Sequence, residues 1–328
     1  MREDQLLSQA WWHEGAALDR VILSGRDVLA YLHTKLATEV RPWRDPLRGG
    51  RVLGVDIKGR TLLHGVLWPE PLAMGESAPR WHLLLPPGRG EVVAAHLERY
   101  VIVEDVSVEA PEQVPVAYWG GEGMVAGDAA RHVLQQREGH WIAPDLWWKT
   151  GGWMAWPVDV RDGSGLERLI PQGAPRRTVE ALHRDSVAAG VVLPGVDVHA
   201  EETIPLEAGL WDEVSVTKGC YLGQEVIERM YSRGRPNKRL MRVRSAAGSV
   251  PAARSSLRSA DGVDSGWVTR AVPLDDGGWE GLAYVRRAAL DAGAPLRSEG
   301  DGVVEIGAFV GGEAPPSGHG RSAKGGLL

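Results

Sequence analysis

The single cysteine of the chain, Cys220, lies in the segment KGCYLGQE, which runs from Lys218 to Glu225. A cysteine thiolate is the form that attacks electrophiles and binds metals, and a nearby cation or helix N-terminus favours that form. Lys218 stands two residues before Cys220, and a helical pattern begins directly after the segment. Gly219 and Gly223 allow a tight turn and the close approach of a ligand. The segment therefore predicts a reactive thiol at an open, electropositive site, although a free cysteine is also often a small buried hydrophobe.

One cysteine limits the chemistry that the chain can perform. It excludes an internal disulfide, a dithiol cycle and an all-protein iron–sulfur cluster, which in most cases uses four ligands. A structural zinc site would need three further ligands, and the nearest histidines in the sequence, His183 and His199, show no ligand spacing. A Cys–His hydrolase would depend on contacts made only in the folded chain. We therefore expect no stable metal, with Cys220 as a reactive thiol or a transient iron–sulfur ligand.

Composition indicates an ordinary globular protein. The 328 residues are 43% hydrophobic and 24% charged, which fits two or three domains. The net charge of −6 does not favour a nucleic-acid partner. The chain shows neither a membrane-length apolar run nor the apolar region of a secretory signal, so we expect a cytoplasmic protein. Of its fourteen tryptophans, several lie between Asp145 and Asp159, where they would fill a core or form an aromatic wall for a flat heterocycle.

The elements that must position these residues begin with a strand and a helix. An apolar strand is predicted at 21–23. Apolar residues then recur at helical spacing from Val28 to Leu36. Ser24 is the expected helix cap, and Asp27 would lie in the first turn, near the positive end of the helix.

Later patterns alternate between strands and helices. A hairpin is expected to turn at Lys58 and Gly59. Helices are expected at 126–136, 177–191 and 224–232, and strand-sized segments dominate after them. The predicted units are an N-terminal α+β domain at 1–104, a central α+β domain ending in KGCYLGQE at 105–234, an all-β unit at 235–311 and a disordered tail at 312–328.

The segment KGCYLGQE resembles the signature of the YgfZ folate-binding proteins. These are related to a mitochondrial iron–sulfur assembly factor and belong to the superfamily of the glycine-cleavage T-protein, an aminomethyltransferase. Similar segments extend from Leu18 to Val310. The resemblance implies an α+β fold of three domains arranged as a cloverleaf, with a C-terminal β-barrel and tetrahydrofolate in a central hole. The matching residues of the signature loop are Lys218, Gly219, Cys220, Tyr221, Gly223, Gln224 and Glu225.

The same resemblance implies a role in making or repairing iron–sulfur enzymes, including enzymes that thiomethylate tRNA. Cys220 would perform the chemistry, with Lys218 favouring its thiolate form. The expected partners are folate and iron–sulfur client enzymes or assembly proteins, without direct contact to nucleic acid or membrane, and the protein is expected to be a monomer. The residues expected to contact the folate are Glu207, Asp185, Tyr221 and Arg235.

Two departures from the family patterns leave alternatives open. The T-protein has an aspartate pair after its hairpin glycines, used in methylene transfer, where this chain has Leu63 and His64. Many relatives carry a pterin-binding glutamate where this chain has Ala188, so that Asp185 or Glu207 would have to substitute. The alternatives to a maturation factor are a tetrahydrofolate-dependent one-carbon transferase or demethylase of the T-protein type, and a folate-binding or sensing module without chemistry.

Overall fold

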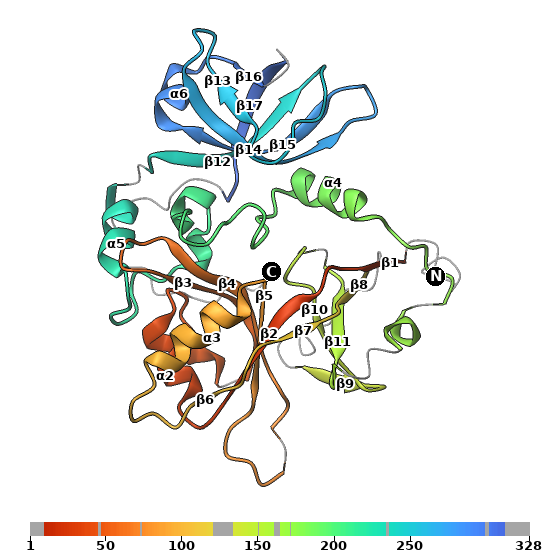
Figure 1. Ribbon diagram of the computed structural model, residues 1–328, viewed down its shortest axis with the longest axis vertical. Helices are drawn as coiled ribbons and strands as arrows, with labels where there is room; N and C mark the ends of the chain where they lie inside the picture. Colours follow the sequence, from red (N-terminus) through yellow and green to blue (C-terminus); the bar gives the residue numbers. More distant parts are fainter. Residues whose placement is uncertain are drawn as a thin grey trace.

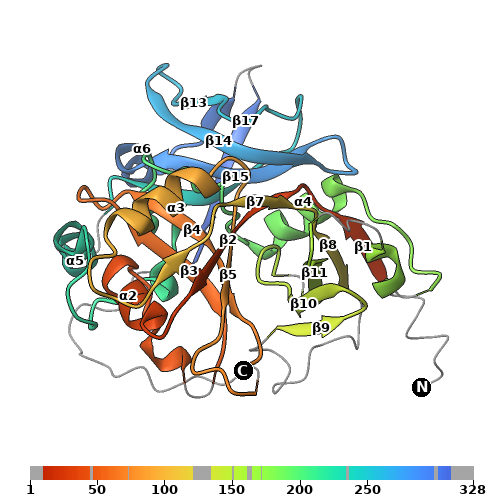
Figure 2. The ribbon, with the colours of Figure 1, turned by 60° about the horizontal axis from the view of Figure 1, so that its bottom comes forward.

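The computed structural model shows two open β-sheets and a closed β-barrel, joined by a long segment that contains the signature loop (Figures 1 and 2). The barrel lies at one end, and the two sheets lie side by side at the other (Figure 1). This arrangement confirms the expected α+β fold with a C-terminal barrel. The structure describes residues 10–44, 47–72, 74–120, 134–149, 151–160, 165–170, 172–233, 236–298 and 302–311.

The first sheet has the strand order β3-β4-β5-β2-β6, with β7 also paired to β2. Strands β3 and β4 form the expected hairpin around Lys58 and Gly59, and Gly59 adopts a φ of 72° there. Two helices pack on this sheet and bury a core that includes Leu32 and Leu97. The elements are β2 (Leu18–Ser24), α2 (Val28–Lys35), η1 (Arg41–Trp43), β3 (Gly50–Val55), β4 (Thr61–Pro69), β5 (Trp81–Leu85), α3 (Gly90–Arg99), β6 (Ser107–Val108) and β7 (Glu112–Val114).

The expected start of α2 was wrong. Ser24 ends strand β2 and does not cap the helix, and Asp27 precedes the first helical residue, Val28. Gly25 has a φ of 118°, so the chain makes a turn between strand and helix. The Asp27 carboxylate accepts a hydrogen bond from the backbone N–H of Asp105 at 2.9 Å, which ties the turn to a later segment of the chain.

The second sheet has the order β1-β8-β11-β10-β9. Its edge strand β1 comes from the start of the described chain and pairs with β8, so the N-terminal segment joins both sheets. The helix expected at 126–136 falls mostly outside the described residues, and its last residues, Gln135 and Gln136, belong to strand β9. The strands are β1 (Trp11–Glu14), β8 (Ala117–Gly120), β9 (Gln135–Arg137), β10 (His140–Pro144) and β11 (Trp153–Pro157). The domain boundaries expected from the sequence remain predictions.

A long segment connects the second sheet to the barrel and passes between the barrel and both sheets (Figure 1). Its helix α4 is capped by Thr178, whose Oγ1 accepts a bond from the N–H of Ala181 at 3.3 Å, and it ends at Gly190 with a φ of 67°. Helix α5 begins at Gln224, within the last residues of the signature segment, as the sequence predicted. The elements are η3 (Leu166–Leu169), α4 (Val179–Ala189), η4 (Pro205–Ala208), η5 (Trp211–Glu213) and α5 (Gln224–Arg233).

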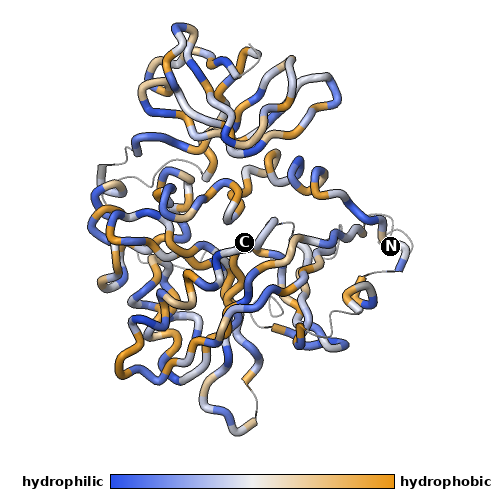
Figure 3. The backbone as a smooth tube through the Cα atoms, viewed as in Figure 1, coloured by the Kyte–Doolittle hydropathy of each residue, from blue (hydrophilic) through white to orange (hydrophobic). Residues whose placement is uncertain are grey.

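The barrel closes in the order β12-β15-β14-β13-β16-β17. Hydrophobic and hydrophilic residues alternate along its strands (Figure 3), and the inward set includes Leu257, Val268 and Trp279. Closure leaves no unpaired sheet edge along this path. The elements are β12 (Lys238–Ser245), β13 (Ser256–Arg258), β14 (Asp264–Pro273), β15 (Trp279–Arg286), α6 (Arg287–Ala292), β16 (Leu296–Ser298) and β17 (Val303–Phe309).

Candidate functional site

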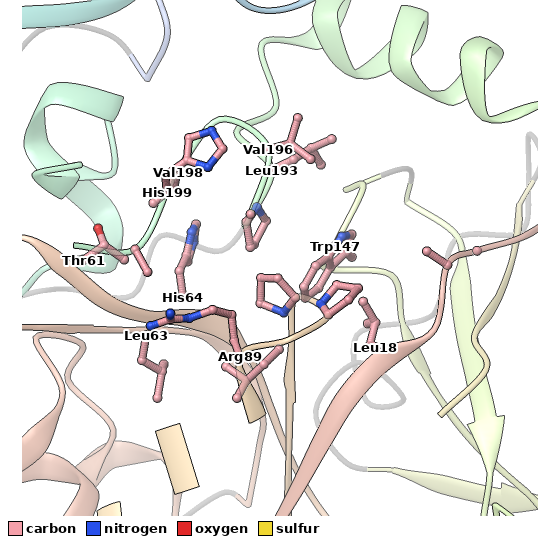
Figure 4. Close-up of a pocket in the computed structure, with 18 of the residues that line it drawn as sticks. Leu18, Thr61, Leu63, His64, Arg89, Trp147, Leu193, Val196, Val198 and His199 are labelled. Atoms are coloured by element: carbon pink, nitrogen blue, oxygen red, sulfur yellow. The ribbon is translucent and has the colours of Figure 1, made fainter. Parts of the chain in front are cut away.

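A cavity of about 470 Å³ lies where the two sheets meet the segment that follows α4 (Figure 4). Strand β4 contributes Thr61 and His64, and the loop before α3 contributes Arg89. The segment from Leu193 to Glu202 forms the opposite wall. The lining is mostly apolar with a few polar groups, which is typical of a small-molecule site.

A buried polar cluster of Arg51, His64 and Glu213 lies beside this cavity. The Arg51 Nε is 2.8 Å from Glu213 Oε1, and the His64 Nε2 is 2.9 Å from Glu213 Oε2. Arg51 also donates to the backbone oxygens of Leu146 at 3.2 Å and Val192 at 3.0 Å. One guanidinium therefore joins strand β3 to three segments that are distant in the sequence.

The cluster fixes the charge of its members. Burial by itself would raise the pKa of Glu213, but the adjacent Arg51 and His64 outweigh it and lower that pKa to about 2. Burial lowers the pKa of His64, against the opposing effect of Glu213. At neutral pH, Glu213 is thus a carboxylate and His64 is a neutral imidazole.

Aromatic side chains from the tryptophan-rich segment form another part of the lining. Trp147 and Trp148 line the cavity together with Tyr118, and Trp148 packs edge-on against His183 with ring centroids 5.1 Å apart. The Asp145 carboxylate accepts hydrogen bonds from the N–H groups of Trp147 and Trp148 at 2.9 and 3.0 Å. Trp147, Trp148 and Trp156 also belong to the adjacent core, so the core interpretation holds, and the wall for a flat heterocycle stays a prediction.

The wall opposite His64 is fastened to the barrel. Asp197 is fully buried in this wall, and its carboxylate accepts a bond from Thr269 Oγ1 at 2.6 Å. Arg270 on β14 lies 3.0 Å from the same carboxylate, and Tyr284 donates to the Asp197 backbone oxygen at 3.0 Å. The barrel therefore helps to hold the shape of the cavity.

The signature loop lies between α2 and α5 and exposes its cysteine. The backbone N–H of Tyr221 donates to Gln224 Oε1 at 3.3 Å, which steadies the turn into α5. Gly223 has a φ of 77°, and a Cβ there would lie 2.1 Å from the backbone oxygen of Asp56. The glycine thus lets the loop lie directly against the tip of the β3–β4 hairpin.

Lys218 makes contacts other than the one expected. Its ammonium is buried and donates to the backbone oxygens of Leu36 at 2.7 Å and Thr38 at 2.9 Å, and it lies 5.2 Å from the centre of the Tyr221 ring. Burial lowers its pKa to about 8. These contacts fasten the loop to the end of α2, and no described contact joins the ammonium to Cys220. Its proposed effect on the thiolate stays a prediction.

The cavity and the predicted site residues do not coincide. Cys220, Tyr221, Glu207 and Asp185 are not among the residues that line the cavity. Glu207 pairs with Lys238 at 2.7 Å, and Asp185 pairs with Arg177 at 2.7 Å. Ala188 is exposed on α4 and also lies outside the lining. The predicted residue Arg235 lies outside the described residues.

Sequence reasoning missed most of the polar lining. Four histidines contribute to it, and no spacing in the sequence connects them, because they come from β1, β4, α4 and the segment after α4. Only His64 had a signal, as the residue that replaces an aspartate of the T-protein. Over the described ranges, no group of three or more His, Cys, Asp or Glu side chains is placed to hold a metal ion. The polar lining is His13, His64, His183, His199, Arg89, Thr61 and Glu202.

Three curated proteins are similar in sequence to parts of the chain. A chloroplastic Arabidopsis thaliana protein named as a transferase is 30% identical over 157 residues, 47% of this chain and 35% of that protein. The mouse mitochondrial iron–sulfur cluster assembly factor IBA57 is 29% identical over 202 residues, 60% and 54% of the two chains. The tRNA-modifying protein YgfZ of Edwardsiella ictaluri is 31% identical over 163 residues, 45% and 48% of the two chains. Over these parts the chain is similar to YgfZ and IBA57, as its signature segment predicted.

The chain spans about a third to a half of the length of these curated relatives, and no family model matches it. The crystal structure of glycine cleavage system aminomethyltransferase T from Bartonella henselae superimposes with a TM-score of 0.74 at 16% identity, covering 93% of this chain and 87% of the other. This match confirms the T-protein fold. Among the described helices, none combines the length and the apolar character needed to cross a membrane.

Proposed function

We propose that this protein acts in the maturation or repair of iron–sulfur enzymes, including enzymes that thiomethylate tRNA, with Cys220 as its working thiol. The observation that carries the proposal is an exposed cysteine in a loop that is otherwise anchored. Lys218 fastens one end of the loop to α2, and Gly223 places the other end against the β3–β4 hairpin. A thiol held in this way meets a protein partner without any rearrangement of the fold.

The exposed thiol and the cavity would have different roles in this proposal. Cys220 does not line the cavity, so a client enzyme or assembly protein would meet it from the outside. This separation supports a factor that works on another protein more than an enzyme that converts a molecule in its own pocket. The names of IBA57 and YgfZ support iron–sulfur assembly and tRNA modification as the process. We also propose a monomer in the cytoplasm, although named relatives are chloroplastic and mitochondrial.

The cavity supports a reduced folate as the bound small molecule. Its size suits a drug-sized ligand, and Trp147 and Trp148 offer a flat apolar wall for a pterin ring. His64 and Glu202 would meet polar groups of that ring, and the partly exposed Arg89 would pair with a carboxylate of the glutamate tail. A bound tetrahydrofolate would supply a carrier for one-carbon units. The lining residues named above would bind and orient the folate.

The thiol is tested by complementation in a strain that lacks its YgfZ-type protein. We expect Cys220→Ser to fold and accumulate like the wild type, yet to leave iron–sulfur enzyme activity and tRNA thiomethylation at the level of the null strain. Thr217→Ser, a similarly small change at another exposed residue of the same loop, is the matched control and should restore both. Full rescue by Cys220→Ser would reject the assignment.

The folate is tested by calorimetric titration of tetrahydrofolate into the wild type and Cys220→Ala. Because Cys220 does not line the cavity, both proteins should bind with the same affinity. Absence of binding to the wild type would remove folate from the proposal. Loss of binding in Cys220→Ala alone would show that the thiol and the folate share one site, against the separation described above.

A one-carbon transferase of the T-protein type is the second candidate, favoured by the common fold. The described lining of the cavity contains one carboxylate, that of Glu202, whereas Leu63 and His64 occupy the positions of the aspartate pair. Turnover of glycine-cleavage or demethylation substrates with tetrahydrofolate would support this candidate over the maturation factor.

A further inference from the structure

The two nitrogens of the His64 ring lie in different surroundings. Nε2 is 2.9 Å from Glu213 Oε2 and 2.8 Å from Arg51 Nη2. Nδ1 is buried and has no hydrogen-bond partner among the described residues. Of the side chains that line the cavity in the described chain, His64 alone has a buried polar atom in this state. Buried polar atoms are nearly always paired, so this nitrogen requires an explanation.

The partners of Nε2 determine what Nδ1 can do. A carboxylate only accepts hydrogen bonds and a guanidinium only donates them, so Nε2 cannot satisfy both at once. Arg51 Nη2 keeps the backbone oxygen of Val192 as an acceptor at 3.0 Å, whereas the hydrogen bond described for Glu213 Oε2 is the one to His64. The favoured tautomer therefore has Nε2 protonated and donating to Glu213. Nδ1 then carries a lone pair and acts as an acceptor.

The unpaired nitrogen belongs to a side chain that lines the cavity. Arg51 and Glu213, the partners of Nε2, do not line it, so Nδ1 is the ring nitrogen left for a ligand. Figure 4 shows His64 extending from β4 toward the wall that carries Val198 and His199. Bulk water does not reach Nδ1, so a ligand contacts it only after the side chains around it move.

We propose that His64 is the acceptor through which the cavity selects its ligand, and that the ligand presents a ring N–H or amino group at this point. Glu213 and Arg51 are positioning residues that fix the tautomer and the direction of the ring. The inference rests on the proposed function, because it assumes that a flat heterocycle enters the cavity. It adds a requirement: the ligand must donate a hydrogen at this position. A methylated nitrogen is excluded because its methyl group would leave Nδ1 unpaired, and an acceptor is excluded because two lone pairs would meet.

Two substitutions separate recognition from structure. In His64→Gln, the side-chain amide takes the place of Nε2, donates to Glu213 and accepts from Arg51, but nothing replaces Nδ1. In His64→Asn, the amide takes the place of Nδ1 and the Nε2 contacts are lost. We expect His64→Gln to melt close to the wild type and to bind tetrahydrofolate roughly tenfold more weakly, the effect of one lost hydrogen bond. His64→Asn should show the reverse pattern, with a lowered melting temperature and a smaller loss of affinity.

Imidazole ¹⁵N spectra give a readout that a merely structural residue would not change. In the free protein, the His64 spectrum should show the tautomer protonated at Nε2, and its Nδ1 signal should shift when tetrahydrofolate binds. His82 is the matched control, because it is buried outside this cavity and both its nitrogens have partners, Glu70 at 2.7 Å and Trp156 Nε1 at 3.3 Å. Its signals should stay in place.

The outcomes distinguish this inference from the proposed function. A wild type that does not bind the folate overturns the proposed ligand, and the inference with it. A wild type that binds, while His64→Gln binds equally well or the Nδ1 signal does not move, overturns the inference alone. Weakened binding by a stable His64→Gln together with a shift confined to His64 supports both.

Discussion

Lys218 and Cys220 are separated by one residue but face opposite surroundings. Lys218 is 7% exposed, and its ammonium donates to the backbone oxygens of Leu36 and Thr38, whereas the Cys220 thiol is exposed to solvent. Thr38 in turn donates through Oγ1 to the backbone oxygen of Glu213 at 2.8 Å. Hydrogen bonds from Lys218 to Thr38 and from Thr38 to Glu213 thus connect the loop that presents the thiol to the polar cluster beside the cavity.

Removal of the buried charge of Lys218 should change how stability depends on pH. Its pKa is about 8 in the folded chain against an ordinary value of 10.5, so between these values the unfolded chain binds more protons and the free energy of unfolding rises with pH. The neutral amine still has two hydrogens for its two acceptors. From pH 8 to 10.5 the wild type should therefore gain up to about 3 kcal/mol relative to Lys218→Met.

Chemical denaturation across this pH range measures the difference. Lys58→Met, which removes an exposed lysine at the hairpin tip, should follow the wild-type curve in parallel. Parallel curves for the wild type and Lys218→Met would contradict the assigned burial of the ammonium.

Acid should act on the cluster beside the cavity. The pKa of Glu213 is about 2 in the folded chain against 4.5 ordinarily, so its contribution is complete above pH 4.5 and is lost as the pH falls through 2. Glu213→Gln should lower the free energy of unfolding at pH 7 by about 3 kcal/mol or more, because Arg51 stays buried without its countercharge. The variant should also lose the part of the fall in unfolding free energy at acid pH that comes from protonation of Glu213.

A second variant tests whether the loss comes from the unpaired guanidinium. Arg51→Met combined with Glu213→Leu removes both charges and should be less destabilised than the sum of the two single variants. Urea denaturation at pH 7 and pH 3 gives both values. If the loss of unfolding free energy in the double variant equals the sum of the two single losses, Arg51 and Glu213 are not coupled.

The two glycines of the signature loop should tolerate substitution differently. At Gly223 a methyl group would meet the backbone oxygen of Asp56 at 2.1 Å in a left-handed conformation, whereas at Gly219 it would meet nothing within 4 Å. Gly223→Ala should therefore lower the free energy of unfolding by more than about 2 kcal/mol. Gly219→Ala should stay within about 0.5 kcal/mol of the wild type. Thermal unfolding compares them directly, and equal melting temperatures would refute the packing of the loop against the hairpin.

Several features of the fold follow from local sequence. The Lys58–Gly59 turn, the helix that begins at Gln224 and the predominance of strands in the C-terminal unit were predicted, because turn residues and apolar spacing act over a few neighbours. The helix cap predicted at Ser24 was wrong because a distant residue determines the geometry of this turn. Asp27 accepts its hydrogen bond from Asp105, a residue that no local window includes.

The sequence by itself determined the signature segment, the family that it resembles and the order of α+β units followed by a barrel. Only the tertiary structure decided that the Lys218 ammonium turns inward, and that the cavity is lined by His64 and the tryptophans and not by Cys220. The physical reason is that a buried charge or an unpaired ring nitrogen depends on backbone carbonyls and side chains brought from distant segments. The packing of the two sheets and the barrel determines which of these groups come into contact. The spacing of residues along the chain does not predict those contacts.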